Sequence, residues 1–325
     1  MKTGEDRLVQ KITRALAGNG GTSLVLGAGD DAALLKPRAG YQTILTCDWF
    51  LEGSHFLRDK HPPDSIGWKC LARAISDVAA MGGQPQYFLL SLALPQSHTS
   101  QWLDGFLKGL ARAARRFDCR LAGGDTTRNR EILINVTVTG EAPAGRAVLR
   151  SGAKPRDLIF VSGRLGEAEL GLRSLRNGRV TNQRNRRWLK KHLYPVPRVA
   201  LGRWLAGNRL PTAMMDLSDG LSTDLSRLCS ASRVGARIAI DKIPRVNLPG
   251  GKGRGHYDVT ELALHGGDDY ELLFTTRPRQ AGRVPSAFQG LPLTCIGEIT
   301  GRTELIAIGP GGREGRLAAG GWDPF

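Results

Sequence analysis

The strongest constraint on the fold of this chain is an alternation of short apolar runs with stretches of helical periodicity. Runs such as QTILTCD, which ends on Asp48, QYFLLSLALP and DLIFVSG have the length and composition of buried strands. Between such runs, residues 63–81 and 100–117 repeat apolar side chains at the three- and four-residue spacing of a helix. The alternation predicts an α/β fold, and 325 residues are enough for two domains.

The same periodicities predict elements along the whole chain and indicate one domain boundary. Further strands are expected over residues 23–26, 119–123, 132–142, 213–217, 236–240, 270–276, 295–300 and 304–308. Further helices are expected over 5–17, 167–175, 176–191, 221–231 and 259–264, and YPVPRVALG at 194–202 is expected to open another. The segment GEAPAGRAVLRSGAKPRD is rich in glycine, proline and basic residues, which is typical of a linker. We therefore expect two domains, residues 1–148 and 149–325.

Composition excludes several classes of protein. The chain has no apolar stretch of the ~20 residues that a membrane helix needs, and its first residues lack the apolar core of a signal peptide, so a cytoplasmic location without membrane contact is expected. Five cysteines without a CxxC pair predict neither a disulfide framework nor a zinc site. The formal charge of +16 raises nucleic acid as a partner, but no binding motif accompanies the basic run RNGRVTNQRNRRWLKK. We interpret that run as a solvated helical face and nucleic acid as an unlikely partner.

Aspartates at glycine turns and element ends are the chemical signal in this sequence. Nine of the 30 acidic residues stand at such places: Asp30, Asp31, Asp48, Asp77, Asp125, Asp216, Asp219, Asp268 and Asp269. One aspartate after a glycine is usually a turn or helix cap, but several carboxylates that converge repel one another unless cations neutralise them. Magnesium suits this pattern because it takes one or two carboxylates together with water and phosphate oxygens. No P-loop, protein-kinase set or nucleophile elbow is present.

An ordered set of motifs carries a family resemblance. GAGDDAALL, CDWFLEGSHF, AISDVAAMGGQP, LAGGDTT, LRSGAKPRDLIFVSG, YPVPR, MMDLSDGLSTDL, HGGDDYELLFT and GGWDPF follow one another from about residue 4 onward. In order and spacing this set resembles the thiamine-monophosphate kinase family of the AIR synthetase superfamily. The resemblance implies a PurM-like two-domain α/β fold, in which the N-terminal domains of two copies form a β-barrel and the C-terminal domain closes over the nucleotide. It also implies a homodimer and transfer of a phosphoryl group from ATP to thiamine monophosphate.

The resemblance also implies a set of site residues. Several Mg²⁺ ions would be held by Asp31, Thr46, Cys47 through its carbonyl, Asp48, Asp77, Asp125, Asp216 and Asp219. ATP would contact Gly124, Asp125, Arg150 and Ser218, and thiamine monophosphate would contact His55, Asp268 and Trp322. No covalent nucleophile is expected, because the acceptor is a phosphate monoester that is largely dianionic near neutral pH. Magnesium would screen the repulsion between the two anions and align them for direct in-line transfer.

Other interpretations stay open from the residues alone. His55 could be an ordinary loop histidine, Trp322 a C-terminal anchor packed on the core, and Arg150 a partner of a nearby acid. The sequence departs from the family pattern at Cys47, at Asp268 and in its GGWDPF ending. A second hypothesis is another ATP-dependent member of the superfamily, and a third, of a different class, is a basic nucleic-acid-binding protein.

Overall fold

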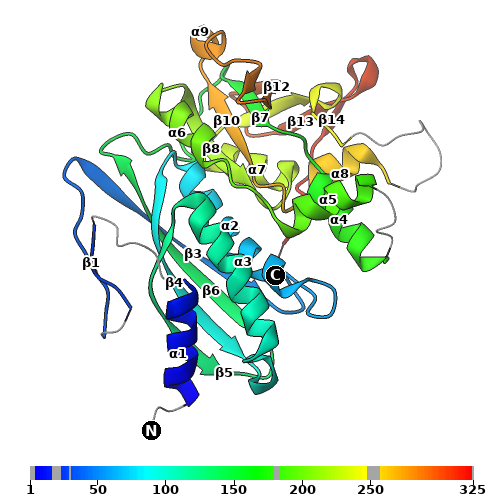
Figure 1. Ribbon diagram of the computed structural model, residues 1–325. Helices are drawn as coiled ribbons and strands as arrows, with labels where there is room; N and C mark the ends of the chain where they lie inside the picture. Colours follow the sequence, from blue (N-terminus) through cyan, green and yellow to red (C-terminus); the bar gives the residue numbers. More distant parts are fainter. Residues whose placement is uncertain (1–3, 17–22, 29–30, 179–182, 247–256, 324–325) are drawn as a thin grey trace. The chain divides into compact units, whose positions relative to one another are not determined.

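The computed structural model describes residues 4–16, 23–28, 31–178, 183–246 and 257–323 (Figure 1). The chain divides into two compact units. The N-terminal unit holds Met1–Ala79 and Gly83–Gly145, and the C-terminal unit holds Ala80–Gly82 and Arg146–Phe325. The mixed α/β fold class predicted from the sequence is confirmed.

The N-terminal unit is a four-stranded sheet with helices. Its elements are α1 (Gly4–Ala15), β1 (Leu24–Leu26), β2 (Leu34–Leu35), β3 (Tyr41–Leu51), α2 (Pro63–Ala80), β4 (Gln84–Leu94), η1 (Gln96–His98), α3 (Gln101–Phe117), β5 (Arg120–Arg128) and β6 (Leu133–Pro143). The sheet order is β3-β6-β4-β5, so β3 and β5 are its two edges. β6 pairs antiparallel with β3 and β4, whereas β4 and β5 are parallel.

The two faces of this sheet differ in burial. Val136 of β6 and Leu90 of β4 pair in register and are 0% and 2% exposed on the face that α2 and α3 cover (Figure 1). On the opposite face Leu45 and Trp49 of β3 are 69% and 55% exposed, and Leu89 of β4 is 41% exposed. We call this second surface the open face. Because strand side chains alternate, every second residue of β3 lies on it.

The C-terminal unit is a larger sheet between two layers of helices. It contains β7 (Leu158–Ser162), α4 (Glu167–Arg176), α5 (Gln183–Leu193), α6 (Val199–Gly207), β8 (Pro211–Leu217), α7 (Leu221–Ser232), β9 (Gly235–Ala239), η2 (Ile240–Lys242), α8 (Val259–His265), β10 (Glu271–Thr276), α9 (Pro278–Ala281), β11 (Ala287–Phe288), β12 (Leu291–Thr300), β13 (Leu305–Ile308), η3 (Pro310–Gly312) and β14 (Glu314–Arg316). The main strand order is β14-β13-β9-β12-β7-β10-β8, and β11 pairs with β12.

Alternate residues of the central strands feed two separate cores. Met215 of β8 and Leu273 of β10 pack with Leu225 of α7. The neighbouring Met214 and Phe274 pack instead with α6. Both sides of these strands are therefore buried, which explains why their sequences read as continuous apolar runs.

The expected elements are present, with two informative differences at their ends. The strand expected to end on Asp48 continues to Leu51, and the strand expected over 119–123 continues to Arg128. In both cases the neighbouring strand supplies partners beyond the glycine or aspartate, as in the register pair Asp48 with Val136. Asp48 and Asp125 thus lie within strands rather than after them. Among the described residues no helix is long and apolar enough to cross a membrane.

Candidate functional site

A polar contact joins β3 to α2 in the N-terminal unit, and Asp48 lies on the same side of β3 as this contact. Thr46 and Asp48 stand at two-residue spacing between the buried Ile44 and Phe50, so all four share the helix-covered side of β3. The Thr46 hydroxyl donates a hydrogen bond of 2.5 Å to the Asp77 carboxylate, which stands near the end of α2. The fold therefore brings β3 and α2 together through the residues predicted to bind magnesium.

The donor set of these three residues is chemically uniform. One hydroxyl and two carboxylates are hard oxygen ligands, which suit Mg²⁺ in company with water and phosphate oxygens. The thiol of Cys47 lies on the open face instead, where Asn135 contacts it at 3.1 Å through its amide nitrogen. Among the described residues no three His, Cys, Asp or Glu side chains gather into a complete metal centre. A cation here needs ligands from outside this cluster.

Asp125 does not join the β3–α2 cluster within one chain. It pairs with Ser91 of β4 in β5, which is the edge of the sheet opposite β3. The neighbouring Gly124 has φ +155° and lies so close to Leu90 that a Cβ would be 1.9 Å from the Leu90 carbonyl oxygen, so this position requires glycine. Asp31 lies exposed between β1 and β2, and Asp30 lies outside the described residues.

His55 follows β3 in a turn. The ring Nδ1 accepts a hydrogen bond of 3.0 Å from the Leu51 amide, and the ring lies 5.8 Å from that of Phe50. This contact orients the ring at the C-terminal end of the strand that carries Asp48.

In the C-terminal unit, Asp216, Ser218 and Asp219 lie at the end of β8 and the start of α7. Asp216 is 3% exposed. The amides of Ser218 and Asp219 donate to the Asp224 carboxylate at 3.1 and 3.0 Å, which closes the turn. Burial raises the pKa of Asp224 to about 7, although these amide hydrogen bonds and Arg227 oppose the rise. Since both amides are used, Ser218 has its hydroxyl rather than its N–H to offer a phosphate.

Arg227 is a member of this site that the sequence analysis missed. It pairs with the carboxylate of Asp219 and lies 3.0 Å from that of Asp224. Its spacing of three residues from Asp224 on α7 is the only local signal that could have revealed it. The predicted cation ligand Asp219 therefore has a protein counter-ion in this structure.

The C-terminal tail lies against the same turn. The Trp322 amide donates to the Asp219 carbonyl oxygen at 3.0 Å, and the Gly321 amide donates to the Thr223 hydroxyl at 3.0 Å. A Cβ on Gly321 would be 1.8 Å from the Asp219 carbonyl oxygen, so only glycine fits. Trp322 is 45% exposed, which contradicts a residue packed in the core.

A second turn, residues 266–270, lies beside the first. The Asp268 amide donates to the Ser218 carbonyl oxygen and the Tyr270 amide to that of Leu217, both at 2.8 Å. The predicted ATP residue Ser218 and the predicted substrate residues Asp268 and Trp322 are thus gathered around Asp219. Arg150 lies apart on an exposed segment, where its carbonyl oxygen accepts from the Ser232 hydroxyl at 3.1 Å.

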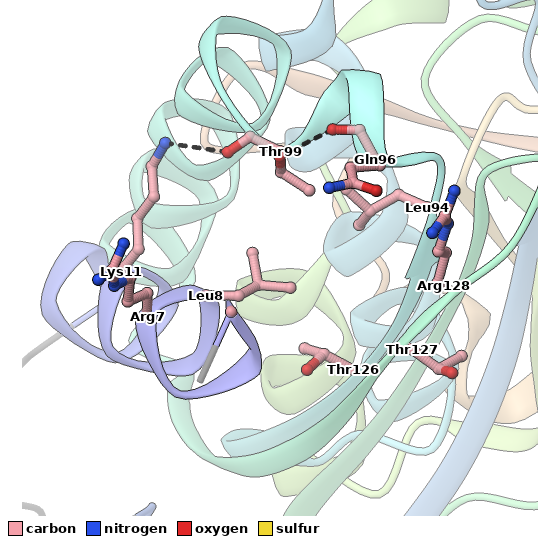
Figure 2. Close-up of a pocket in the computed structure, with 10 residues that line it drawn as sticks. Arg7, Leu8, Lys11, Leu94, Gln96, Thr99, Thr126, Thr127 and Arg128 are labelled. Carbon is pink, nitrogen blue, oxygen red and sulfur yellow. Dashed lines mark hydrogen bonds between the residues drawn. The ribbon is translucent and has the colours of Figure 1, made fainter. Parts of the chain in front are cut away.

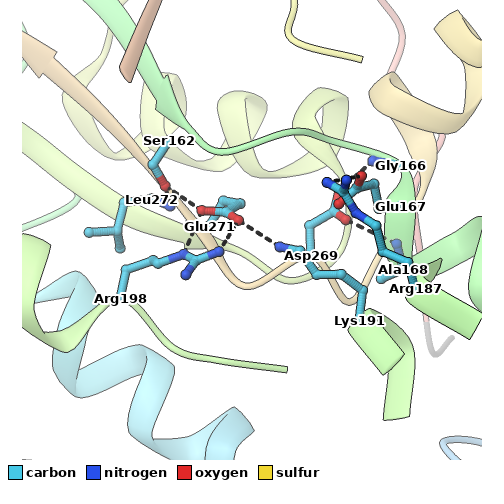
Figure 3. Close-up of polar contacts among 10 residues, drawn as sticks. All are labelled: Ser162, Gly166, Glu167, Ala168, Arg187, Lys191, Arg198, Asp269, Glu271 and Leu272. Atoms are coloured by element: carbon cyan, nitrogen blue, oxygen red, sulfur yellow. Dashed lines mark hydrogen bonds and ion pairs between the residues drawn. The ribbon is translucent and has the colours of Figure 1, made fainter. Parts of the chain in front are cut away.

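A buried ionic network underlies the second turn (Figure 3). The Glu271 carboxylate, fully buried, accepts hydrogen bonds from Lys191 at 2.7 Å, from Ser162 at 2.6 Å and from Arg198. Burial alone would raise the pKa of Glu271, but the charges of Lys191 and Arg198 outweigh it and lower the pKa to about 2. The neighbouring Asp269 caps α4 by accepting from the Gly166 amide at 2.6 Å, and its burial raises its pKa to about 7.

Arg186, Arg187 and Lys190 of the basic run are exposed, as expected of a solvated helical face, but Lys191 at its end joins this network. Lys191 points into the protein toward Glu271, Arg187 pairs with Glu167 at 3.0 Å, and the adjoining His192 is 1% exposed. The acidic partners of Arg187 and Lys191 lie 20 and 80 residues away along the chain, so local sequence spacing could not predict these ion pairs.

A separate pocket of about 520 Å³ lies in the N-terminal unit (Figure 2). Its lining comes from α1 and from the ends of β4 and β5, with Arg7, Lys11 and Arg128 at its rim and Leu8 and Leu94 inside. None of the site residues predicted from the sequence lines it.

Comparison with known proteins gives a consistent result. The family "AIR synthase related protein, N-terminal domain" matches residues 29–142, and the corresponding C-terminal domain matches residues 157–309. The thiamine-monophosphate kinase of Salmonella typhimurium is 38% identical over 86% of this chain and 85% of its own.

Solved structures similar to this chain indicate the same family as the sequence relatives. The structure of thiamine-monophosphate kinase from Stenotrophomonas maltophilia superposes with a TM-score of 0.82 at 36% identity, covering 94% of this chain and 97% of that one. A structure described as "AaThiL complexed with AMPPCP and TMP" has a TM-score of 0.78 at 30% identity, covering 100% and 99% of the two chains.

Proposed function

The chain belongs to the thiamine-monophosphate kinase family of AIR synthase related proteins, and from this premise we propose how its residues transfer a phosphoryl group from ATP to thiamine monophosphate. The products are thiamine diphosphate and ADP. The observation that carries the function is identity of 30% to 38% over nearly the whole chain, including similarity to a structure that holds AMPPCP and TMP. The predicted family and activity are confirmed by these matches.

The residue roles follow from the two clusters. Thr46, Asp48 and Asp77 hold magnesium on the N-terminal unit, and Asp216 and Asp219 hold it on the C-terminal unit. The fit rests on a donor set made only of hard oxygens around the Thr46–Asp77 hydrogen bond. When bound, magnesium supplies positive charge that lowers the repulsion between two phosphate anions. Ser218 donates its hydroxyl to ATP, and Asp268, Trp322 and His55 orient thiamine monophosphate.

No described residue needs to act as a nucleophile or general base. The attacking atom is an oxygen of the acceptor phosphate, which is mostly deprotonated near neutral pH because its second pKa is about 6. The protein therefore contributes position and charge, which supply most of the catalysis in phosphoryl transfer. Arg227, paired with Asp219, keeps that carboxylate neutralised in the absence of a cation.

A second copy of the chain completes the site. Asp48 and Asp125 lie on the two opposite edge strands of one sheet, so one chain does not place them around a common ion. The open face exposes Leu45, Trp49 and Leu89, an apolar surface of the kind that marks an interface. A homodimer that buries this face and sets β5 of one copy beside β3 of the other brings Asp125 of the partner subunit toward Asp48. Closure of the two sheets into a barrel also removes their exposed edges.

Two further proposals concern the location and the partners of the protein. We propose a cytoplasmic location, because the proposed reaction consumes ATP. The nucleic-acid alternative rested on the net charge and the basic run, and within that run Lys191 binds the buried Glu271 while the exposed Arg187 pairs with Glu167.

A direct assay tests the function. The protein is incubated with ATP, Mg²⁺ and thiamine monophosphate, and thiamine diphosphate is measured by chromatography. Omitting Mg²⁺ should abolish the product. Thiamine in place of thiamine monophosphate should give none, because the acceptor has to be a phosphate. Absence of thiamine diphosphate in the complete mixture would refute the proposed function.

A further inference from the structure

The Asp268 carboxylate rests on two buried side chains. Its Oδ1 accepts a hydrogen bond of 2.8 Å from the Tyr270 hydroxyl, and its Oδ2 lies 3.5 Å from Nδ1 of His192. Tyr270 is 2% exposed and His192 1% exposed, whereas the Asp268 side chain is 27% exposed. The carboxylate is therefore presented at the surface by two groups that cannot easily move.

The backbone of this turn is held in an unusual conformation. Asp268 and Tyr270 have φ values of +67° and +49°, in the left-handed region that residues other than glycine rarely adopt. Their two amide hydrogen bonds to the β8 turn maintain it. Left-handed residues of this kind cost free energy and cluster at functional sites. Here the conformation aims the Tyr270 hydroxyl back at the carboxylate two residues earlier.

The ionic network fixes the helix that supplies the histidine. His192 directly follows Lys191 in the last turn of α5, and the Lys191 ammonium is bound to Glu271, the residue after Tyr270 (Figure 3). Arg198 binds the same carboxylate from the N-cap of α6. Lys191 and His192, which are consecutive in α5, therefore contact Glu271 and Asp268 at the start of β10. Because both contacts come from one helix, neither Glu271 nor Asp268 can shift alone.

We propose that Tyr270, assisted by His192, is a positioning residue that sets the orientation of the Asp268 carboxylate and thereby the affinity for thiamine monophosphate. This inference rests on the proposed function. The thiamine moiety is a cation that carries N–H donors, and a carboxylate held in one orientation loses less conformational freedom on binding such a group than a mobile one. Neither side chain touches the transferred phosphoryl group, so the effect falls on binding and not on the rate of transfer.

The test is the Tyr270→Phe variant, which removes one hydroxyl and keeps the ring. We expect the KM for thiamine monophosphate to rise about tenfold, a change of about 1.4 kcal/mol, with kcat and the KM for ATP within twofold of wild type. The melting temperature should fall by no more than about 4 °C. Tyr87→Phe, at a buried tyrosine of β4 in the other unit, is the matched control and should leave all three kinetic constants unchanged.

A double-mutant cycle shows whether Tyr270 acts through Asp268. In an Asp268→Ala background, Tyr270→Phe should have no further effect on the KM for thiamine monophosphate. An unchanged KM in the single variant would overturn the inference, and so would an equal rise in both backgrounds. A wild-type protein that makes no thiamine diphosphate would refute the proposed function instead, so the two failures are distinguishable.

Discussion

A mixture of two inactive variants should regain activity if the site is shared between two copies of the chain. Asp48→Asn and Asp125→Asn each remove one proposed cation ligand without removing packing, and each variant alone should be inactive. β3 and β5 are separated by two intervening strands, β6 and β4. With about 4.8 Å between neighbouring strands, their separation is about 14 Å across the sheet. Two oxygens that share one Mg²⁺ lie at most about 4 Å apart, because each is about 2.1 Å from the ion.

The expected magnitude follows from the symmetry of a dimer. In a heterodimer of the two variants, one site receives both intact aspartates and the other receives neither. A heterodimer isolated through two different affinity tags should therefore show about half of the wild-type activity, and an unfractionated equal mixture about a quarter. The measurement is thiamine diphosphate formed per minute at saturating substrates.

The reciprocal heterodimer is the control. Wild-type chain paired with a chain carrying both substitutions gives two damaged sites if Asp125 acts on the partner's Asp48, and one intact site if both act in the same chain. An active reciprocal heterodimer together with an inactive first heterodimer would refute the shared site.

Four further results are expected. Thr46→Val removes the hydroxyl that contacts Asp77, and should lower kcat at limiting Mg²⁺ more than at saturating Mg²⁺; an equal loss at both concentrations would contradict a role in metal binding. Trp49→Asp should convert the dimer to a monomer in light scattering, whereas Val25→Asp, an exposed control on β1, should not. Glu271→Gln leaves Lys191 and Arg198 without their buried carboxylate, and should lower the free energy of unfolding at pH 7 by about 3 kcal/mol; Glu261→Gln, at an exposed position, should change it by less than about 0.5 kcal/mol in the same urea titration. Because the pKa of Glu271 is lowered to about 2, its contribution is present above about pH 4.5 and should disappear as the pH falls toward 2, so the difference between wild type and Glu271→Gln should shrink over that range.

Periodicity predicted the helices and strands because each buries one stripe or face in a local pattern. It failed at the ends of β3 and β5, where TCD and GGD look like turn signals. There the neighbouring strands continue the hydrogen-bond ladder past the polar residue. Pairing with a distant strand is a tertiary effect, and a local pattern does not contain it.

The candidate site was predictable in its residue types and not in its arrangement. The recurrence of aspartate identified Asp48, Asp77, Asp216 and Asp219 as a chemically related set. Strand order, which separates Asp125 from Asp48, depends on which strands meet in the folded sheet. The counter-ion Arg227 and the Glu271 network were missed for the same reason, since charges that pair across the fold look like solvated surface residues in the sequence.

The contact of Gly321 with the Asp219 turn has a consequence for the order in which the enzyme matures. Gly321 is translated about 100 residues after Asp219, which at about 5–20 residues per second takes roughly 5–20 seconds. Throughout that interval the Asp219 turn lacks its contacts with the C-terminal tail. A ribosome that stops before Gly320 would release a chain that contains the residues of both cores but lacks the tail that binds the Asp219 turn. An exopeptidase that removes the same few residues would produce the same folded but incomplete enzyme.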